Sequence, residues 1–179
     1  MKTFLHVQAL TKEYGKEKAV NQVTFSLYKN TATALIGPNG AGKTTTLSIL
    51  AGLLKQTSGS VVIDGDIQGD IRSEIGFLPQ YPQFYSWLTA LEFIEMVAKL
   101  SGIDGKMIKS QSVRTLDFVG LADAKNKKVG TFSGGMKQRL GLAQAIVHKP
   151  GLLLLDEPVS ALDPMGRREV LNLLKELQE

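Results

Sequence analysis

The chain has 179 residues, and its content of 43% hydrophobic and 21% charged residues is typical of a single soluble globular domain. It has no aliphatic run long enough to span a membrane, no apolar start typical of a secretory signal, and no cysteine from which a disulfide framework could form. The net charge of +4 is spread along the chain, and its one basic cluster, Lys125–Lys128, is interpreted as a solvated loop. We therefore expect a cytosolic protein without a nucleic-acid partner.

The first part of the chain is predicted to form short strands, because its apolar residues alternate or run between turn signals. The predicted strands are Thr3–Ala9, Val23–Tyr28, Thr31–Ile36, Gly59–Gly65 and Ile75–Leu78. Thr33–Ile36, within the third of these, is expected to be buried. A helix is expected from Thr45 to Leu50, beyond a glycine-rich loop.

That loop, Gly37–Thr45, fits the phosphate-binding pattern G-x-x-x-x-G-K-[ST] without a mismatch. The predicted strand before it and helix after it are the setting that the motif requires. Glycines let backbone N–H groups approach phosphate oxygens, and the helix N-terminus adds partial positive charge. Lys43 is expected to reach the β- and γ-phosphates of a nucleotide, and the Thr44 hydroxyl to ligate Mg²⁺. A chance match by a glycine-rich turn is the alternative, which the ordinary frequency of glycine disfavours.

Helices are predicted over the middle of the chain from the spacing of its apolar residues. They run from Thr89 to Leu100, from Lys106 to Val119 and from Ser133 to His148. A buried strand follows at Leu152–Leu155, and a last helix begins with Asp163 as its N-cap and Pro164 at its first position. This order predicts a sheet core with a helical insertion that forms a second lobe.

Two carboxylates, Asp156 and Glu157, follow the predicted strand Leu152–Leu155 directly. A continuous aliphatic run suits a strand that is buried on both faces, and α/β sheets place ligands at the carboxyl ends of such strands. Asp156 is expected to hold Mg²⁺, and Glu157 to accept a proton from an attacking water. The alternative is a core strand that ends in ordinary surface acids, which the phosphate loop makes the weaker interpretation.

The segment Ser133–Arg139 reads S-G-G-M-K-Q-R and resembles the signature of ATP-binding cassette (ABC) ATPases, L-S-G-G-x-x-Q-R. The chain departs from that signature at Phe132, which replaces the leucine. Four other motifs resemble those of the family and occur in the family's order. They are Tyr14 in E-Y-G, Gln80 in F-L-P-Q, Asp156-Glu157-Pro158, and Ser160-Ala161-Leu162-Asp163. By these motifs, from Tyr14 to Asp163, the chain is identified as a member of the family.

The resemblance implies an α/β fold: a P-loop NTPase core sheet with an N-terminal antiparallel β-subdomain and an inserted helical subdomain. We expect the nucleotide-binding core over residues 1–83 and 150–179, and the helical subdomain over residues 84–149. Family members carry a histidine beyond the helix that Asp163 begins. Neither His6 nor His148 is placed for that role, so a C-terminally truncated domain is expected, with turnover and stability in doubt.

The resemblance also implies a role for each matching residue, with ATP and Mg²⁺ as the cofactors. Tyr14 would stack on adenine, although a half-buried tyrosine at a strand end is the alternative. The other residues expected to bind ATP within the chain are Val20, Asn39, Gly40, Ala41, Gly42, Lys43, Thr44 and Thr45. Gln80 would ligate Mg²⁺ with Thr44 and Asp156, and the catalytic residues would be Glu157, Lys43 and Gln80.

The family further implies a head-to-tail dimer, homomeric or heteromeric, in which each subunit completes the other's ATP site. The residues expected to act across the dimer are Ser133, Gly134, Gly135 and Asp163. Transmembrane permease subunits are expected to contact Gln80–Leu88, with Trp87 as an anchor. The alternative is that the aromatic residues of this segment pack inside the helical lobe.

In that assembly the protein would be an ATPase on the cytoplasmic face of the membrane, powering transport. Leu162–Arg167 resembles the subgroup that serves multidrug, antibiotic, sodium and polysaccharide exporters. Two other functions stay open: an ABC ATPase without a membrane partner, and a nucleotide-binding module without turnover.

Overall fold

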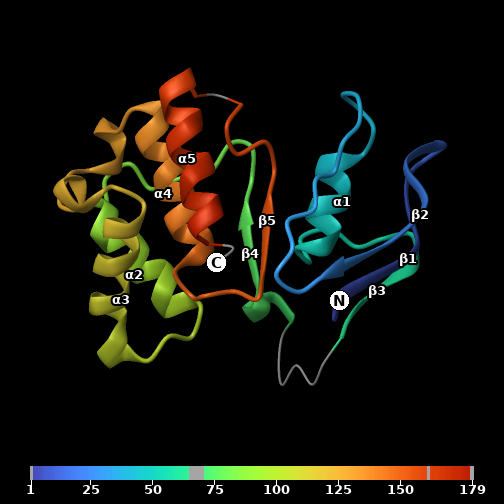
Figure 1. The fold of residues 1–179 in the computed structure, drawn as a ribbon, viewed down its shortest axis with the longest axis horizontal. Helices are drawn as coiled ribbons and strands as arrows, with labels where there is room; N and C mark the ends of the chain where they lie inside the picture. The colour runs from blue at the N-terminus through green and yellow to red at the C-terminus, as the bar shows by residue number, and fades with distance from the viewer. Residues whose placement is uncertain (1, 65–70, 161, 178–179) are drawn as a thin grey trace. The chain divides into compact units, whose positions relative to one another are not determined.

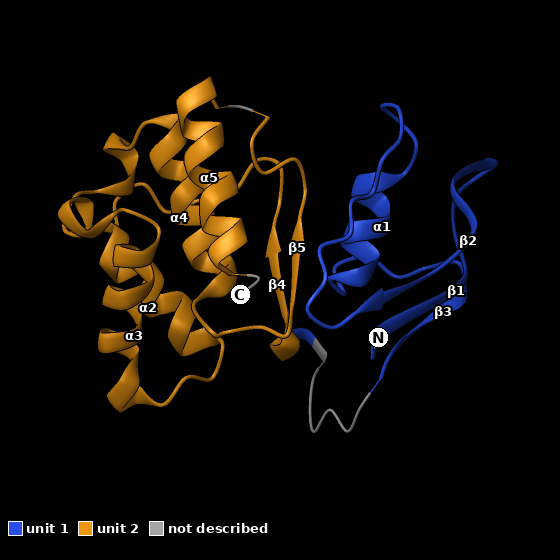
Figure 2. Cartoon of the chain, viewed as in Figure 1, with its two compact units in different colours: residues 1–72, 178–179 blue, residues 73–177 orange. Residues whose placement is uncertain are grey.

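The computed structural model describes residues 2–64, 71–160 and 162–177. These residues form two compact units, one from the N-terminus to Arg72 and one over Ser73–Leu177 (Figure 2). Each unit has its own sheet and helices (Figure 1). The first unit contains β1 (Thr3–Tyr14), β2 (Glu17–Tyr28), α1 (Lys43–Leu50) and β3 (Ser58–Ile63).

The first unit is built on an antiparallel sheet in the order β2-β1-β3. A tight turn at Gly15, with φ of 61°, joins β1 to β2 and pairs Tyr14 with Glu17. Leu5, Val7 and Leu10 of β1 are completely buried, and they form the core of this unit. β1, the central strand of this sheet, therefore carries the most completely buried apolar side chains of the unit.

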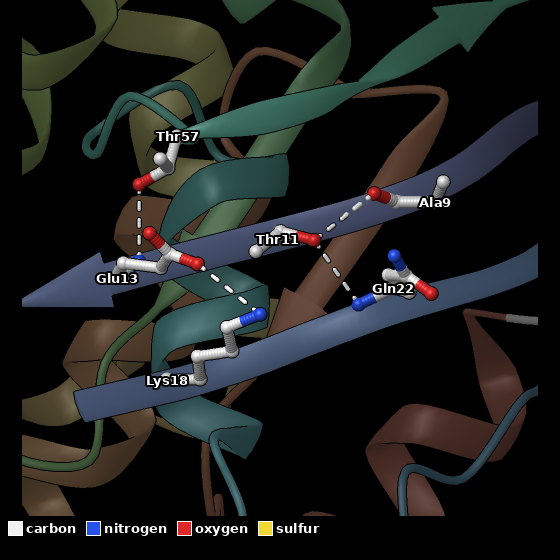
Figure 3. Close-up of polar contacts among 6 residues, drawn as sticks. All are labelled: Ala9, Thr11, Glu13, Lys18, Gln22 and Thr57. Carbon is white, nitrogen blue, oxygen red and sulfur yellow. Dashed lines mark hydrogen bonds and ion pairs between the residues drawn. The ribbon is translucent and has the colours of Figure 1, made fainter. Parts of the chain in front are cut away.

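An irregularity in β1 is stabilised by the hydroxyl of Thr11 (Figure 3). Ala9 and Gln22 have positive φ values of 47° and 50°, and the register of β1 with β2 shifts beside them. The Thr11 hydroxyl donates to the Ala9 carbonyl at 3.3 Å and accepts from the Gln22 N–H at 3.1 Å. Thr11 is only 4% exposed, so these bonds satisfy a buried polar group where the regular ladder is interrupted.

The second unit contains a parallel strand pair and most of the helices. Its elements are β4 (Ile75–Leu78), α2 (Ala90–Leu100), α3 (Gly105–Phe118), the short 3₁₀ turns at Ala122–Ala124 and Val129–Thr131, α4 (Gly134–Ile146), β5 (Leu152–Leu155) and α5 (Pro164–Glu176). A further 3₁₀ turn, Ile71–Glu74, precedes β4. No helix in the described residues is long and apolar enough to cross a membrane.

β4 and β5 pair in parallel, with Ile75 opposite Leu152 and Leu78 opposite Leu155. Helix α4 lies against β4 so closely that only glycine fits at Gly76, where a Cβ would be 2.1 Å from the Ala145 carbonyl oxygen. The strand pair is thereby attached to a helical core of completely buried side chains. These include Leu78, Ile94, Leu116, Leu121, Leu140, Leu142 and Val147.

Most predicted elements are confirmed, with small changes at their ends. β4 and β5 have the predicted bounds, and Asp163 caps α5 with Pro164 in its first turn. β1 continues to Tyr14 and β2 begins at Glu17, because the two strands remain paired beyond the register shift at Thr11. The predicted Gly59–Gly65 strand is observed as Ser58–Ile63, and Gly65 lies outside the described residues.

The prediction of a buried strand at Thr31–Ile36 is wrong. These residues have no strand structure, and Ile36 is 90% exposed. A strand requires backbone-to-backbone hydrogen bonds with a neighbouring strand, and none involves Thr31–Ile36 among the described residues. The one bond of this segment joins the Thr31 hydroxyl to the Tyr28 carbonyl at the end of β2.

Helix α2 begins with a capping box formed by Thr89 and Glu92. The pKa of the Glu92 carboxyl lies below its ordinary value of 4.5, because the backbone N–H and hydroxyl of Thr89 donate hydrogen bonds to it and Lys128 adds positive charge. A lowered folded-state pKa means that the carboxylate stabilises the fold above the unfolded-state pKa. That contribution is lost as the pH falls through the folded-state pKa.

We expect Glu92→Gln to lower the free energy of unfolding at neutral pH, and the deficit to shrink below about pH 4.5. Urea unfolding of both proteins at successive pH values measures this deficit. Glu95→Gln, in the same helix but without a hydrogen-bond partner among the described residues, is the matched control. A deficit that does not change with pH would contradict the role of the ionised carboxylate.

Candidate functional site

Two glycines give the phosphate-loop candidate an unusual backbone conformation. Gly40 and Gly42 have φ values of 83° and 82°, in the left-handed region that favours glycine. Gly42 is the N-cap of α1, and no side chain caps this helix end. The first N–H groups of α1 therefore stay available to an anion, together with the partial positive charge of the helix terminus.

Gly42 also lies directly against β2. A Cβ at this position would be 2.1 Å from the Ala19 carbonyl oxygen and 3.1 Å from Val20 Cγ2. Val20 is 4% exposed, so its side chain supports the loop from beneath. Whether Val20 also touches a nucleotide remains a prediction.

The side chains of the loop are arranged around its open face. Lys43 Nζ donates to the carbonyl oxygens of Gly37 and Pro38 at 2.8 and 2.9 Å, which holds the ammonium group over the loop. Asn39, Ala41 and Thr44 are exposed, and Thr45 is half-buried. The exposed Thr44 hydroxyl suits a metal ligand.

Tyr14 lies at the end of the hairpin that supports the loop. Its partner Glu17 is on β2, the strand whose Ala19 lies against Gly42. The Tyr14 ring is 53% exposed, and Lys12 Nζ lies 5.0 Å from its centroid. Its half-exposed face can therefore accept a stacked base, while Lys12 adds positive charge beside it.

In the second unit, the ends of β4 and β5 place Gln80 beside the Glu157 carboxylate. The Asp156 N–H donates to the Leu78 carbonyl at 2.9 Å, which continues the parallel pairing by one residue. Asp156 is 4% exposed, whereas Glu157 is exposed and has a positive φ of 49°. Gln80 Nε2 donates to Glu157 Oε2 at 2.8 Å.

The donors predicted to hold Mg²⁺ are chemically suited to it. They are the Thr44 hydroxyl, the Gln80 amide oxygen and the Asp156 carboxylate, which are hard oxygen ligands. Because the Gln80 amide nitrogen faces Glu157, its Oε1 stays available for a metal. The described residues contain no cluster of three histidine, cysteine or acidic side chains.

The N-terminus of α4 carries the candidate residues for a second subunit. Ser133 caps this helix by accepting from the Met136 N–H at 3.3 Å, and Gly134 is exposed. A Cβ on Gly135 would lie 3.8 Å from Leu162 Cδ2, so the helix start contacts the loop before α5. Asp163 Oδ1 caps α5 by accepting from the Gly166 N–H at 2.7 Å, and Ala161 lies outside the described residues.

Comparison with known proteins identifies the family. The sequence profile of the family described as "ABC transporter" matches residues 20–160. The chain belongs to the ABC transporter family. Its predicted fold class, an α/β P-loop NTPase core with an antiparallel β-subdomain and a helical subdomain, is confirmed by the solved ABC cassettes that it matches.

Curated relatives and a solved cassette match nearly the whole chain. It is 53% identical over 175 residues to the uncharacterized ABC transporter ATP-binding protein YxlF of Bacillus subtilis (strain 168), covering 98% of this chain and 59% of that protein. It is 41% identical over 181 residues to the bacitracin transport ATP-binding protein BcrA of Bacillus licheniformis, with coverage of 99% and 58%. The chain thus spans less than two thirds of the length of these relatives. A dimeric post-hydrolysis structure of the ATP-binding cassette MJ0796 with ADP and Pi matches with a TM-score of 0.85 and 31% identity, covering 98% of this chain and 83% of that one.

In the aromatic segment after Gln80, one residue packs inside the helical part and two are exposed. Phe84 packs inside the helical part, edge-on to Phe93 with ring centroids 5.2 Å apart. Trp87 is 66% exposed, and Tyr85 contacts its ring at a centroid distance of 5.1 Å. The segment therefore has an internal anchor and an exposed aromatic pair.

Sequence analysis placed Gln138 in the signature segment but assigned it no role, and the structure connects it to the residue that follows the two carboxylates. Gln138 is 6% exposed, and its Nε2 donates to the Pro158 carbonyl at 2.8 Å. The available signal was an amide within a helix whose neighbouring leucines, Leu140 and Leu142, are completely buried. A buried amide needs a partner, so its position indicates a specific contact.

The two left-handed glycines of the phosphate loop provide a matched pair of variants. Gly40→Ala adds only backbone strain, because no heavy atom lies within 4 Å of its Cβ position. Gly42→Ala adds the same strain and a clash with the Ala19 carbonyl. We expect Gly42→Ala to lose more stability than Gly40→Ala by about 1–3 kcal/mol. Urea unfolding followed by circular dichroism measures both losses, and equal losses would contradict the close approach.

Proposed function

We propose that this chain is the ATP-binding and ATP-hydrolysing part of an ABC transporter and that it powers the movement of a substrate across a membrane. The observation that carries the proposal is the side-by-side ending of β4 and β5, which brings Gln80 to the Glu157 carboxylate. Family membership and the left-handed glycines before α1 support the nucleotide as ATP. The chain spans only part of its relatives, so the proposal concerns the site that these residues form.

Within the proposed site, each group has a task that suits its chemistry. The phosphate loop would bind the nucleotide through the N–H groups of α1 and the Lys43 ammonium, and the exposed Tyr14 ring would stack on the base. Thr44, Gln80 and Asp156 would hold Mg²⁺, which when bound would neutralise charge on the phosphate oxygens. Glu157 would accept a proton from the water that attacks the γ-phosphate, in line with the leaving oxygen.

Two subunits are proposed to form the working ATPase. The Ser133 hydroxyl and the N–H groups at the start of α4 lie at an exposed helix N-terminus, a setting that favours an anion. We propose that Ser133, Gly134 and Gly135 bind the γ-phosphate held by a second ABC subunit. Asp163 would act in the same dimer interface with the oxygen that does not cap α5.

The proposed membrane partner is a permease that contacts the Gln80–Leu88 segment on the cytoplasmic side. The exposed pair of Tyr85 and Trp87 supports this assignment, because aromatic side chains are frequent anchors of protein interfaces. Export is the proposed direction, since a relative with 41% identity is named a bacitracin transport protein. Copurification of the tagged protein with a membrane subunit tests the assembly. Loss of that subunit in Trp87→Ala, but not in Phe84→Leu, would support the exposed pair as the contact.

Lys43→Ala is expected to remove measurable MgATP binding, because the ammonium group supplies the main side-chain charge on the phosphates. Isothermal titration calorimetry of the folded protein measures the loss. Lys16→Ala, an exposed lysine in the turn between β1 and β2, controls for a general loss of positive charge. Unchanged affinity in Lys43→Ala would place the nucleotide site elsewhere.

Glu157→Gln is expected to keep MgATP affinity within about twofold and to lower kcat by about a hundredfold or more, because an amide cannot act as the base. Phosphate release by the assembled protein gives kcat, and calorimetry gives affinity. Glu169→Gln, on α5, is the control for removal of a carboxylate. Hydrolysis by Glu157→Gln at the parent rate would exclude Glu157 as the base.

A further inference from the structure

Gln138 makes the side-chain hydrogen bond that joins α4 to the loop after β5 in the described residues. Its Nε2 donates to the Pro158 carbonyl at 2.8 Å, and the side chain is almost completely buried. Pro158 has no N–H group, so its carbonyl is the only backbone hydrogen-bonding group at this position. The hydrogen bond from Gln138 therefore attaches the backbone of Pro158 to α4.

The residue before Pro158 has an uncommon backbone. Glu157 has a φ of 49°, which a residue with a Cβ adopts only where the surroundings enforce it. Its own carbonyl accepts from the N–H and hydroxyl of Ser160 at 3.2 and 3.1 Å. The Glu157 carbonyl lies in the peptide unit that joins this residue to Pro158, and the Pro158 carbonyl lies in the next one. These bonds therefore hold the two peptide units that follow Glu157.

Gln80 and Gln138 act on Glu157 in different ways. Gln80 donates to the carboxylate itself, so it touches the group that would accept the proton. Gln138 contacts neither that carboxylate nor the phosphate loop in any described hydrogen bond, and it acts on the backbone one residue further along. A change at Gln138 would leave the binding groups in place and alter only the direction of the base.

We propose that Gln138 is a positioning residue for catalysis: through the Pro158 carbonyl it holds Glu157 in the left-handed conformation that aims its carboxylate. The proposal rests on the proposed role of Glu157 as the base. Gln138 belongs to the helix that begins with Ser133–Gly135, so this bond also ties the base to the helix that faces the second subunit in the proposed dimer. A displacement of α4 would reach Glu157 through the same bond.

The test compares Gln138→Met with Gln144→Met in the intact protein, in the assembly that supports ATP turnover. Methionine keeps the length and volume of glutamine but has no N–H donor. Gln144 is on the same helix, is half-buried and has no hydrogen-bond partner among the described residues. We expect Gln138→Met to lower kcat about tenfold or more, with KM and the calorimetric Kd for MgATP within twofold of the parent. Gln144→Met should keep all three values.

Several results would overturn the proposal. A kcat for Gln138→Met within twofold of that for Gln144→Met would show that the bond does not position the base. A Kd that weakens in parallel with kcat would assign Gln138 to nucleotide binding or general stability. If Gln138→Met does not fold, Gln138→Leu carries the same test, because leucine is a smaller apolar side chain that also has no donor. Failure of both variants to fold would make the role of Gln138 purely structural.

Glu157→Gln, measured in parallel, separates this proposal from the proposed function. If Glu157→Gln keeps the parent kcat, the base is wrong and the proposed function fails. If Glu157→Gln blocks turnover while Gln138→Met does not, the base stands and only the positioning role fails.

Discussion

The parallel pairing of β4 with β5 is the constraint on which the second unit depends. Its register places Leu78 beside Leu155, so the residues that follow both strands emerge at one edge of the sheet. The Gln80 amide and the Glu157 carboxylate meet there although 77 residues separate them. A shift of the register by one residue would move the side chains of a strand to the opposite face and break this contact.

Sequence analysis succeeded where the signal was local and failed where a partner decided the structure. β5 could be predicted from four consecutive leucines, and the start of α5 from the Asp163-Pro164 pair, because these residues favour one local conformation. Thr31–Ile36 alternates threonine with alanine before Leu35 and Ile36, yet it has no described backbone-to-backbone hydrogen bond and is not a strand. The length of β1 was also hidden, because its irregularity depends on the Thr11 hydroxyl and the Gln22 N–H.

The candidate site divides in the same way. The phosphate loop is a local signal, because its glycines, lysine and threonine act through their own backbone and side chains. Its binding of a nucleotide stays a prediction, and the structure adds the left-handed backbone of Gly42. The contact of Gln80 with Glu157 and the bond from Gln138 to Pro158 required the fold, since each joins segments from different elements. The close approach of Gly42 to Ala19 likewise depends on the packing of α1 against β2.

One face of α4 explains why its sequence combines glycines with a buried amide. Gly135 and Gln138 are three residues apart and meet Leu162 and Pro158, so both face the loop between β5 and α5. Gly141, three residues further on, continues this face onto β4, where a Cβ would be 2.7 Å from Leu78 Cδ1. Gly141 permits the close approach to β4, and the Gln138 amide donates the hydrogen bond to the Pro158 carbonyl. The same face of α4 therefore contacts both β4 and the loop that carries Glu157.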